Sequence, residues 1–179
     1  MPALFRKRLK HFAADHKAAA AVEFALIAAP LIFMICACIE LAMVFLVDVT
    51  LDNATAIAAR TIRTGTTTSS NTTLAQFKQA ICNNMGWLSG SCVSSLTVDV
   101  RTYSSFSAVA TASSPVVNGA WDTTNNPVQY NTGSGSAIQM VRAYYDWPLF
   151  TPILNGGLST MSNGDALLTA KVVFRNEPF

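Results

Sequence analysis

The sequence is poor in charged residues and almost lacks histidine. Only 12% of its 179 residues are Asp, Glu, Lys or Arg, whereas an average soluble domain has about 25%. The only histidines are His11 and His16, close to the start of the chain. Everything after them therefore lacks the imidazole that Ser-His and Cys-His nucleophile pairs and most zinc sites require.

Clusters of acidic residues are missing as well. The acids beyond Val47 are scattered, with no D-x-D or E-x-x-E pattern, and the "GSGS" stretch at 133–136 is followed by neither a lysine nor a helix start. A phosphate-binding loop needs both. We therefore expect no catalytic site, no metal site and no bound cofactor. A Ser/Lys or two-carboxylate site assembled by the fold is the remaining enzymatic alternative.

The few charges are distributed unevenly. The first 17 residues hold five cations and one acid, a net charge of +4, and no further basic residue occurs until Arg60. This asymmetry follows the positive-inside rule and places the N-terminus in the cytoplasm and the chain beyond Val47 across the membrane. No aromatic residues alternate with an extended basic face, as in many nucleic-acid-binding proteins, so we expect no nucleic acid partner.

A long apolar segment separates these two regions. Residues 18–47 form a 30-residue stretch interrupted only by two glutamates, and about 20 residues suffice for a membrane-spanning helix. A cleaved secretory signal would have a shorter apolar core and a closing small-residue site, so a retained helix is favoured. Apolar residues then continue at spacings of three and four up to Ile62, and Gly65 follows. One helix over 18–64 is predicted, with a kink at Pro30.

The remainder of the chain predicts a small α+β domain. A polar linker over 64–73 leads to a short helix with Thr73 as its N-cap. Alternating patterns predict three antiparallel strands, "LTVDVRTY" from Leu96, "AIQMVRAYY" from Ala137 and "LLTAKVVFRN" from Leu167. The residues between the first two strands are expected to be an irregular excursion. "YYDWPLFTPIL" (144–154) is read as a loop that covers the sheet, or else as a contact surface.

The four cysteines fall into two pairs. Cys82 and Cys92 lie beyond the membrane and close together in the sequence, so a disulfide is predicted there, worth roughly 3 kcal/mol in the chain-entropy model. Cys36 and Cys38, two residues apart on a helix, point to nearly opposite sides and cannot chelate one metal ion. We interpret them as lipid-facing or packing residues.

Several of these motifs, in this order, resemble the TadE-like minor pilins (pseudopilins) of the tight-adherence, or Flp, pilus. The resemblance is carried by the basic leader, "AVEF" at 21–24, the long apolar helix with its internal "IELAMVF", the "LDNATAIAAR" extension and the terminal "VVFRNEPF". It is strongest over residues 17–63 and 171–179.

The resemblance implies that a prepilin peptidase cleaves on the cytoplasmic side, four residues ahead of Glu23. The cut then falls between Ala18 and Ala19, with Ala18 in place of the usual glycine, and Phe24 completes the processing and assembly element. The glutamate would pair with the new N-terminal amine of a neighbouring subunit. The alternative is that Glu23 reaches the cytoplasmic headgroups.

Glu40 lies 17 residues after Glu23, about 25 Å along a helix. It is expected either at the periplasmic face of the membrane or in contact with a polar group of another pilin or of the assembly platform.

The sequence therefore predicts a cytoplasmic leader (1–18), a helix that spans the inner membrane in its first half (19–64) and a periplasmic domain (65–179). The predicted function is that of a minor pilin, which supports pilus assembly by helix packing and can be incorporated in a surface pilus. Its expected partners are the prepilin peptidase, other pilins, the inner-membrane assembly platform and the lipid bilayer. The alternative function is an uncleaved, single-pass periplasmic adhesin or sensing module.

Overall fold

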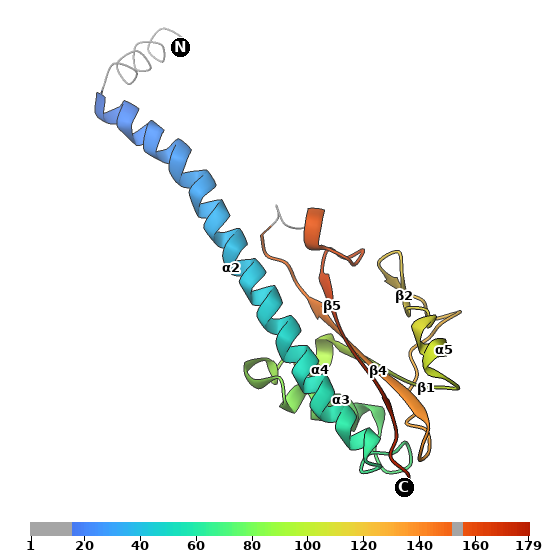
Figure 1. Cartoon of the computed structure of the whole chain (residues 1–179). Helices are drawn as coiled ribbons and strands as arrows, with labels where there is room; N and C mark the ends of the chain where they lie inside the picture. Colours follow the sequence, from blue (N-terminus) through green and yellow to red (C-terminus); the bar gives the residue numbers. More distant parts are fainter. Residues whose placement is uncertain (1–15, 152–155) are drawn as a thin grey trace. The chain divides into compact units, whose positions relative to one another are not determined.

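The computed structural model describes residues 16–151 and 156–179, and side chains from residue 20 onward. The chain divides into two compact units, Met1–Leu41 and Ala42–Phe179. Helix α2 (His16–Arg63) supplies the described part of the first unit and the start of the second (Figure 1). The helical assignment continues without interruption through Pro30.

Within the second unit, α2 buries one stripe of apolar side chains. The residues that the sequence predicts for this stripe are all at most 3% exposed: Val47, Leu51, Ala54, Ala58 and Ile62. They join the main hydrophobic core. Their spacing of three and four residues places them on one side of a helix, which explains why the helix continues beyond the apolar segment.

Helix α2 ends at Arg63 because the chain turns at Gly65, whose positive φ is a backbone conformation that residues with a side chain disfavour. Gly65 has φ +74°, and its N–H donates to the carbonyl oxygen of Ile62 at 3.0 Å. This is the left-handed C-cap expected of glycine. A Cβ on Gly65 would lie 2.5 Å from the ring of Phe179, so a larger residue would also displace the C-terminal aromatic ring.

Short helices follow the linker. Helix α3 (Leu74–Asn83) begins with a capping box, in which the Gln76 N–H donates to Thr73 Oγ1 at 3.3 Å and the Thr73 N–H donates to Gln76 Oε1 at 2.8 Å. The predicted N-cap is thus confirmed. The 3₁₀ helix η1 (Gly86–Leu88) and helix α4 (Cys92–Ser95) lead into the sheet.

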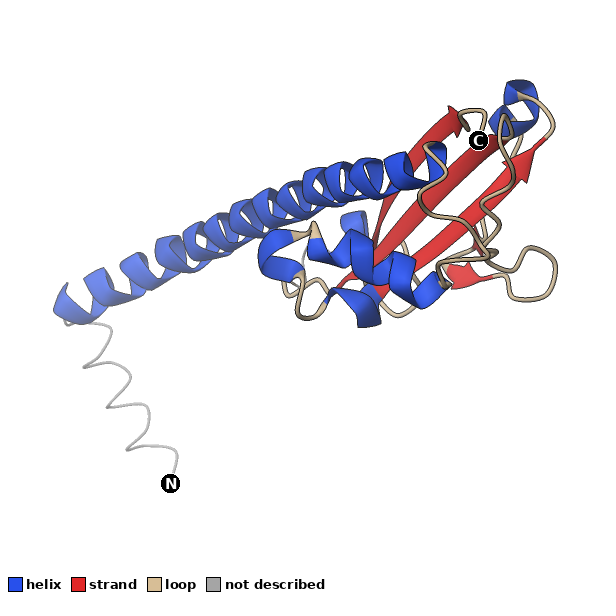
Figure 2. Cartoon of the chain, turned by 90° about the horizontal axis from the view of Figure 1, so that it is seen from below, coloured by secondary structure: helices blue, strands red, loops and turns tan. Residues whose placement is uncertain are grey.

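The main sheet has three antiparallel strands in the order β1-β4-β5 (Figure 2): β1 (Leu96–Tyr103), β4 (Ile138–Trp147) and β5 (Ala166–Arg175). In the register, Val98 lies opposite Ala143, which lies opposite Ala170. The prediction of an α+β domain with three antiparallel strands is confirmed. Strand β4 extends through Trp147, so the start of the stretch expected to be a loop is in fact buried strand.

The two faces of the sheet have different neighbours. Alternate residues of all three strands, including Val100, Val141 and Leu168, join the core that also contains the α2 stripe and residues of α3. The opposite face carries Asp99 and Arg142, both of which are buried. The alternation predicted for the first strand is confirmed, although its polar side is not solvent-exposed.

The excursion between β1 and β4 is more ordered than predicted. It contains helix α5 (Phe106–Ala110) and a hairpin of β2 (Val116–Val117) and β3 (Ala120–Trp121). Asn118 and Gly119 form the hairpin turn with φ of +51° and +73°. Positive φ at both central positions is the geometry that Asn-Gly favours in two-residue hairpins.

Candidate functional site

The N-terminal part of α2 presents apolar side chains to its surroundings on all sides. Phe24, Leu26, Ile27 and Ile32 are 59–73% exposed, and several further large apolar residues up to Ile39 are about half exposed. The most apolar window of this helix has a mean hydropathy of 2.6, and the helix is long and apolar enough to cross a membrane. A helix that is apolar all round requires lipid or other protein as its neighbour.

Glu23 interrupts this apolar surface. Both Glu23 and Phe24 are exposed, and no ion pair formed by Glu23 is found among the described residues. Ala18 and Ala19 lie in the first turn of α2. An ionised carboxylate is unfavourable in hydrocarbon unless a cation or the headgroup region compensates it. Because the Glu23 side chain is exposed, it is accessible to a cation supplied by another molecule.

Glu40 differs from Glu23 in its exposure. It is 0% exposed, and it is among the largest fully buried side chains of the described chain. A buried carboxylate is retained only where polar groups compensate its desolvation. Its predicted role as an intramembrane or interfacial contact remains a prediction.

A disulfide joins the predicted pair, Cys82 and Cys92, with 5.5 Å between their Cα atoms. Both residues are fully buried. The bond connects the end of α3 to the start of α4, and thereby fixes the short helices beside the first strand. Cys36 and Cys38 are free and exposed on the apolar part of α2, in keeping with their interpretation as lipid-facing or packing residues.

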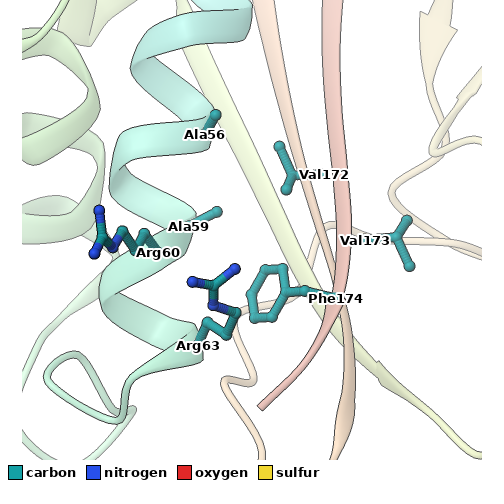
Figure 3. Close-up of a pocket in the computed structure, with 7 residues that line it drawn as sticks. All are labelled: Ala56, Ala59, Arg60, Arg63, Val172, Val173 and Phe174. Carbon is teal, nitrogen blue, oxygen red and sulfur yellow. The ribbon is translucent and has the colours of Figure 1, made fainter. Parts of the chain in front are cut away.

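A groove of about 370 Å³ lies between the second half of α2 and strand β5 (Figure 3). On the helix side, Ala56 and Ala59 point toward the strand, and their small side chains leave the space open. On the strand side, Val172 and Phe174 line the groove. Arg60 and Arg63 also line the groove, and Figure 3 shows Arg63 beside Phe174 and the Arg60 side chain extending away from the strand. Both sides belong to the unit Ala42–Phe179, and no sequence pattern predicted this groove.

A buried ionic network holds the opposite face of the sheet. Arg142 of β4 donates to Asp99 Oδ2 of β1 through Nε at 3.0 Å and Nη2 at 2.7 Å. Arg101 Nε lies 2.9 Å from both carboxylate oxygens of Asp99. Asp99 is 0% and Arg142 is 5% exposed, so a buried anion is compensated by two guanidinium groups.

The same network fastens the excursion to the sheet. The Gln129 N–H donates to Asp99 Oδ1 at 2.8 Å, Arg101 donates to the Asn126 side chain and to the Pro127 carbonyl oxygen, and Arg142 donates to the Ser113 carbonyl oxygen. These groups satisfy the remaining hydrogen-bonding capacity of the buried charges. The network is therefore a structural tether and not a reaction centre.

Asp146 is the other acid of note on this sheet. It is half-buried, its Oδ1 atom has no hydrogen-bond partner among the described residues, and Asp165 is near enough to act on its charge. Burial, together with the charge of Asp165, raises the pKa of the Asp146 carboxyl above its ordinary value. In the part of the chain that the structure describes, Asp146 forms no ion pair.

The described residues contain no group of three or more His, Cys, Asp or Glu side chains that could hold a metal ion. The side chains of His11 and His16 lie outside the described ones. The structure thus presents surfaces for packing, namely the apolar part of α2 and the groove beside β5.

Comparison with known proteins yields one match. Residues 18–60 match the family model described as TadE-like protein, which is a structural and not an enzymatic family. The match confirms the resemblance over the apolar segment and the first part of its extension. No curated protein and no solved structure matches the chain.

Proposed function

We propose that this chain, whose residues 18–60 are TadE-like, is a membrane-anchored minor pilin that supports assembly of a tight-adherence (Flp) pilus through helix packing. Involvement in the pilus system is supported by the family match over residues 18–60. The specific role in assembly and the membrane anchoring are inferred from α2. Its exposed apolar surface needs lipid as its neighbour before assembly and the helices of other subunits after assembly.

The observation that carries this proposal is the exposed acid on the apolar helix. If a prepilin peptidase cleaves between Ala18 and Ala19, the mature chain begins with a free amine, whose reference pKa near 7.7–8.0 leaves it mostly protonated at neutral pH. Glu23 then lies four residues after that amine and is exposed. The ammonium of a neighbouring subunit would compensate the Glu23 carboxylate, with Phe24 beside it in the processing element.

The proposed orientation rests on the charge distribution. A net charge of +4 over the first 17 residues keeps the leader in the cytoplasm, and residues 65–179 are then periplasmic. A disulfide between Cys82 and Cys92 suits that oxidising compartment. The assembly platform of the inner membrane and other pilins are the partners that an apolar helix of this kind would contact.

Deletion of the gene, followed by complementation, tests the proposal. Surface pili should disappear on deletion and return with the wild-type chain, and the mass of the membrane-bound protein should show Ala19 as its first residue. A chain that retains Met1, with normal pili in the deletion strain, would instead support an uncleaved periplasmic adhesin or sensing module.

A further inference from the structure

One face of α2 remains exposed within the unit Ala42–Phe179. Phe45 and Val49 are each 66% exposed, and Asp52, Ala56 and Arg63 are also exposed. At about 100° per residue these positions fall within roughly 40° of one line along the helix. This exposed face points away from the buried stripe and borders the groove beside β5 (Figure 3).

The charges on the exposed face are separated along the helix axis. Asp48 and Asp52 lie toward its start, and Arg60 and Arg63 lie at its end. Among the described residues, Asp48, Asp52 and Arg60 form no ion pair, while Arg63 pairs with Glu177 at 3.6 Å, both side chains being about half exposed. Like charges four residues apart, as in Asp48 and Asp52, destabilise a helix, and a cationic neighbour would relieve this.

A single displacement of a second copy along the helix axis would bring the acidic start of its exposed face level with the basic end of the exposed face of the first copy. Asp48 precedes Arg60 by 12 residues, and Asp52 precedes Arg63 by 11. A parallel copy shifted by about 17 Å along the axis would therefore set both acids level with both cations. Asp48 and Arg60 also lie on opposite flanks of the exposed face, which is the arrangement that two parallel helices need in order to bring them together.

The same displacement matches shape as well as charge. Phe45 precedes Ala56 by 11 residues, so its ring would be level with the groove, where the side chains of Ala56 and Ala59 leave space against Val172 and Phe174. An aromatic side chain inserted between small residues buries a large apolar area. The pairs Asp48–Arg60, Asp52–Arg63 and Phe45–Ala56 therefore all correspond to the same shift along the helix axis.

We propose that the groove between α2 and β5 receives Phe45 of a second copy of this chain, in a parallel pair staggered by about 17 Å. The parallel orientation rests on the proposed membrane anchoring, which inserts both copies in the same direction. An in-register pair would set Asp52 against Asp52 and Arg63 against Arg63. The stagger removes both repulsions.

Cysteine cross-linking in membranes tests the stagger directly. Two differently tagged full-length chains, one with F45C and the other with A56C, are expressed together in cells that lack the other pilus components. Both chains also carry Cys36→Ser and Cys38→Ser, so that the native free cysteines cannot react. Mild oxidation should join F45C to A56C. Ile57, the exposed neighbour of Ala56, points about 100° away, so I57C serves as the matched control and should cross-link to F45C poorly.

Charge exchange provides a second measurement, which changes Asp48 in the F45C chain and then Arg60 in the A56C chain. Asp48→Arg should lower the F45C–A56C product about fivefold, because an exposed ion pair becomes a repulsion worth about 1 kcal/mol. With Asp48→Arg carried by the F45C chain, adding Arg60→Asp to the A56C chain should restore the product, since the acid and the cation that face each other in the staggered pair have then exchanged places between the two chains. Equal membrane levels and a protected Cys82–Cys92 bond would show that the variants fold.

Three results would overturn the staggered pair. F45C–F45C and A56C–A56C products in excess would show an in-register pair, and equal products from A56C and I57C would show random contact. Cross-linking that requires the other pilus components would assign the groove to a different pilin. None of these readouts depends on piliation or on cleavage at Ala18, so the proposed function is tested separately.

Discussion

Glu23 is the residue at which we propose that processing and assembly meet. Glu23→Gln keeps the side chain's shape and removes its charge, so insertion into the membrane should be unchanged or improved, because lipid disfavours the carboxylate. Incorporation should fail, because the ammonium of a neighbouring Ala19 would then be buried without its counter-ion, at a cost of a few kcal/mol.

N-terminal sequencing, membrane levels and surface piliation of wild type and Glu23→Gln measure these effects together. Reduced cleavage would show that the peptidase itself recognises the acid. Normal cleavage with unchanged piliation would mean that Glu23 only reaches the headgroups and has no role in assembly.

Asp99 tests how much the buried ionic network contributes to stability. Asp99→Asn should lower the free energy of unfolding by about 3 kcal/mol or more, because Arg142 would remain buried without an anion. The exposed pair of Arg63 and Glu177 is the control, and Glu177→Gln should cost less than about 1 kcal/mol. Denaturant unfolding of the detergent-solubilised chain measures both values, and equal losses would contradict the distinction.

Asp146 should make stability depend on pH in the direction opposite to most carboxylates. Its pKa is raised in the folded chain by burial and by Asp165, so folding favours the protonated form. This contribution is complete below the unfolded pKa, near 3.9, and is lost as pH rises through the folded pKa. Asp146→Asn should therefore compare more favourably with wild type at pH 7 than at pH 3 in thermal unfolding, and a difference that does not change with pH would contradict this assignment.

At the scale of elements, the disulfide is the constraint that links α3 to α4. Removal of the bond by Cys82→Ser with Cys92→Ser should cost about 3 kcal/mol, as expected for a loop of about 10 residues. Thiol labelling of the denatured, unreduced wild type should reach Cys36 and Cys38 only. Labelling of all four cysteines in protein recovered from membranes would show that the bond does not form in the cell.

Elements with a strong period were predictable from the sequence, because each is specified by its own residues. The stripe from Val47 to Ile62, the cap at Thr73 and the alternation in β1 depend on local spacing alone. The β2–β3 hairpin was missed although "VVNGAW" carries the Asn-Gly signal. Two-residue strands on either side are too short to show alternation.

Features that depend on register were not predictable from the sequence. Asp99 meets Arg142 only because β1 pairs with β4 in one particular register, and a long excursion separates the two strands. The groove likewise requires β5 to lie beside Ala56 and Ala59 of α2. The extension of β4 to Trp147 was missed because the cluster of prolines and aromatics after Tyr145 favoured a loop.

At the scale of the whole molecule, charge should set the orientation of the chain in the membrane. Five cations precede the apolar segment, and the next basic residue is Arg60, so the positive-inside rule predicts that residue 179 is periplasmic. Alkaline phosphatase, which is active only after export, should therefore be active when fused after Phe179. A flexible linker is needed, because the Glu177 N–H donates to the Arg63 carbonyl oxygen at 2.8 Å and the ring of Phe179 lies against Gly65.

The same reporter fused after Lys17, ahead of the apolar segment, is the control and should be inactive. Neutral replacement of four of the five leader cations should lower the activity of the C-terminal fusion, because the charge bias that retains the leader in the cytoplasm would be lost. An inactive C-terminal fusion, combined with fluorescence from a cytoplasmic reporter at the same position, would reverse the orientation. The Cys82–Cys92 bond would then lie in a reducing compartment, and the periplasmic assembly role would be wrong.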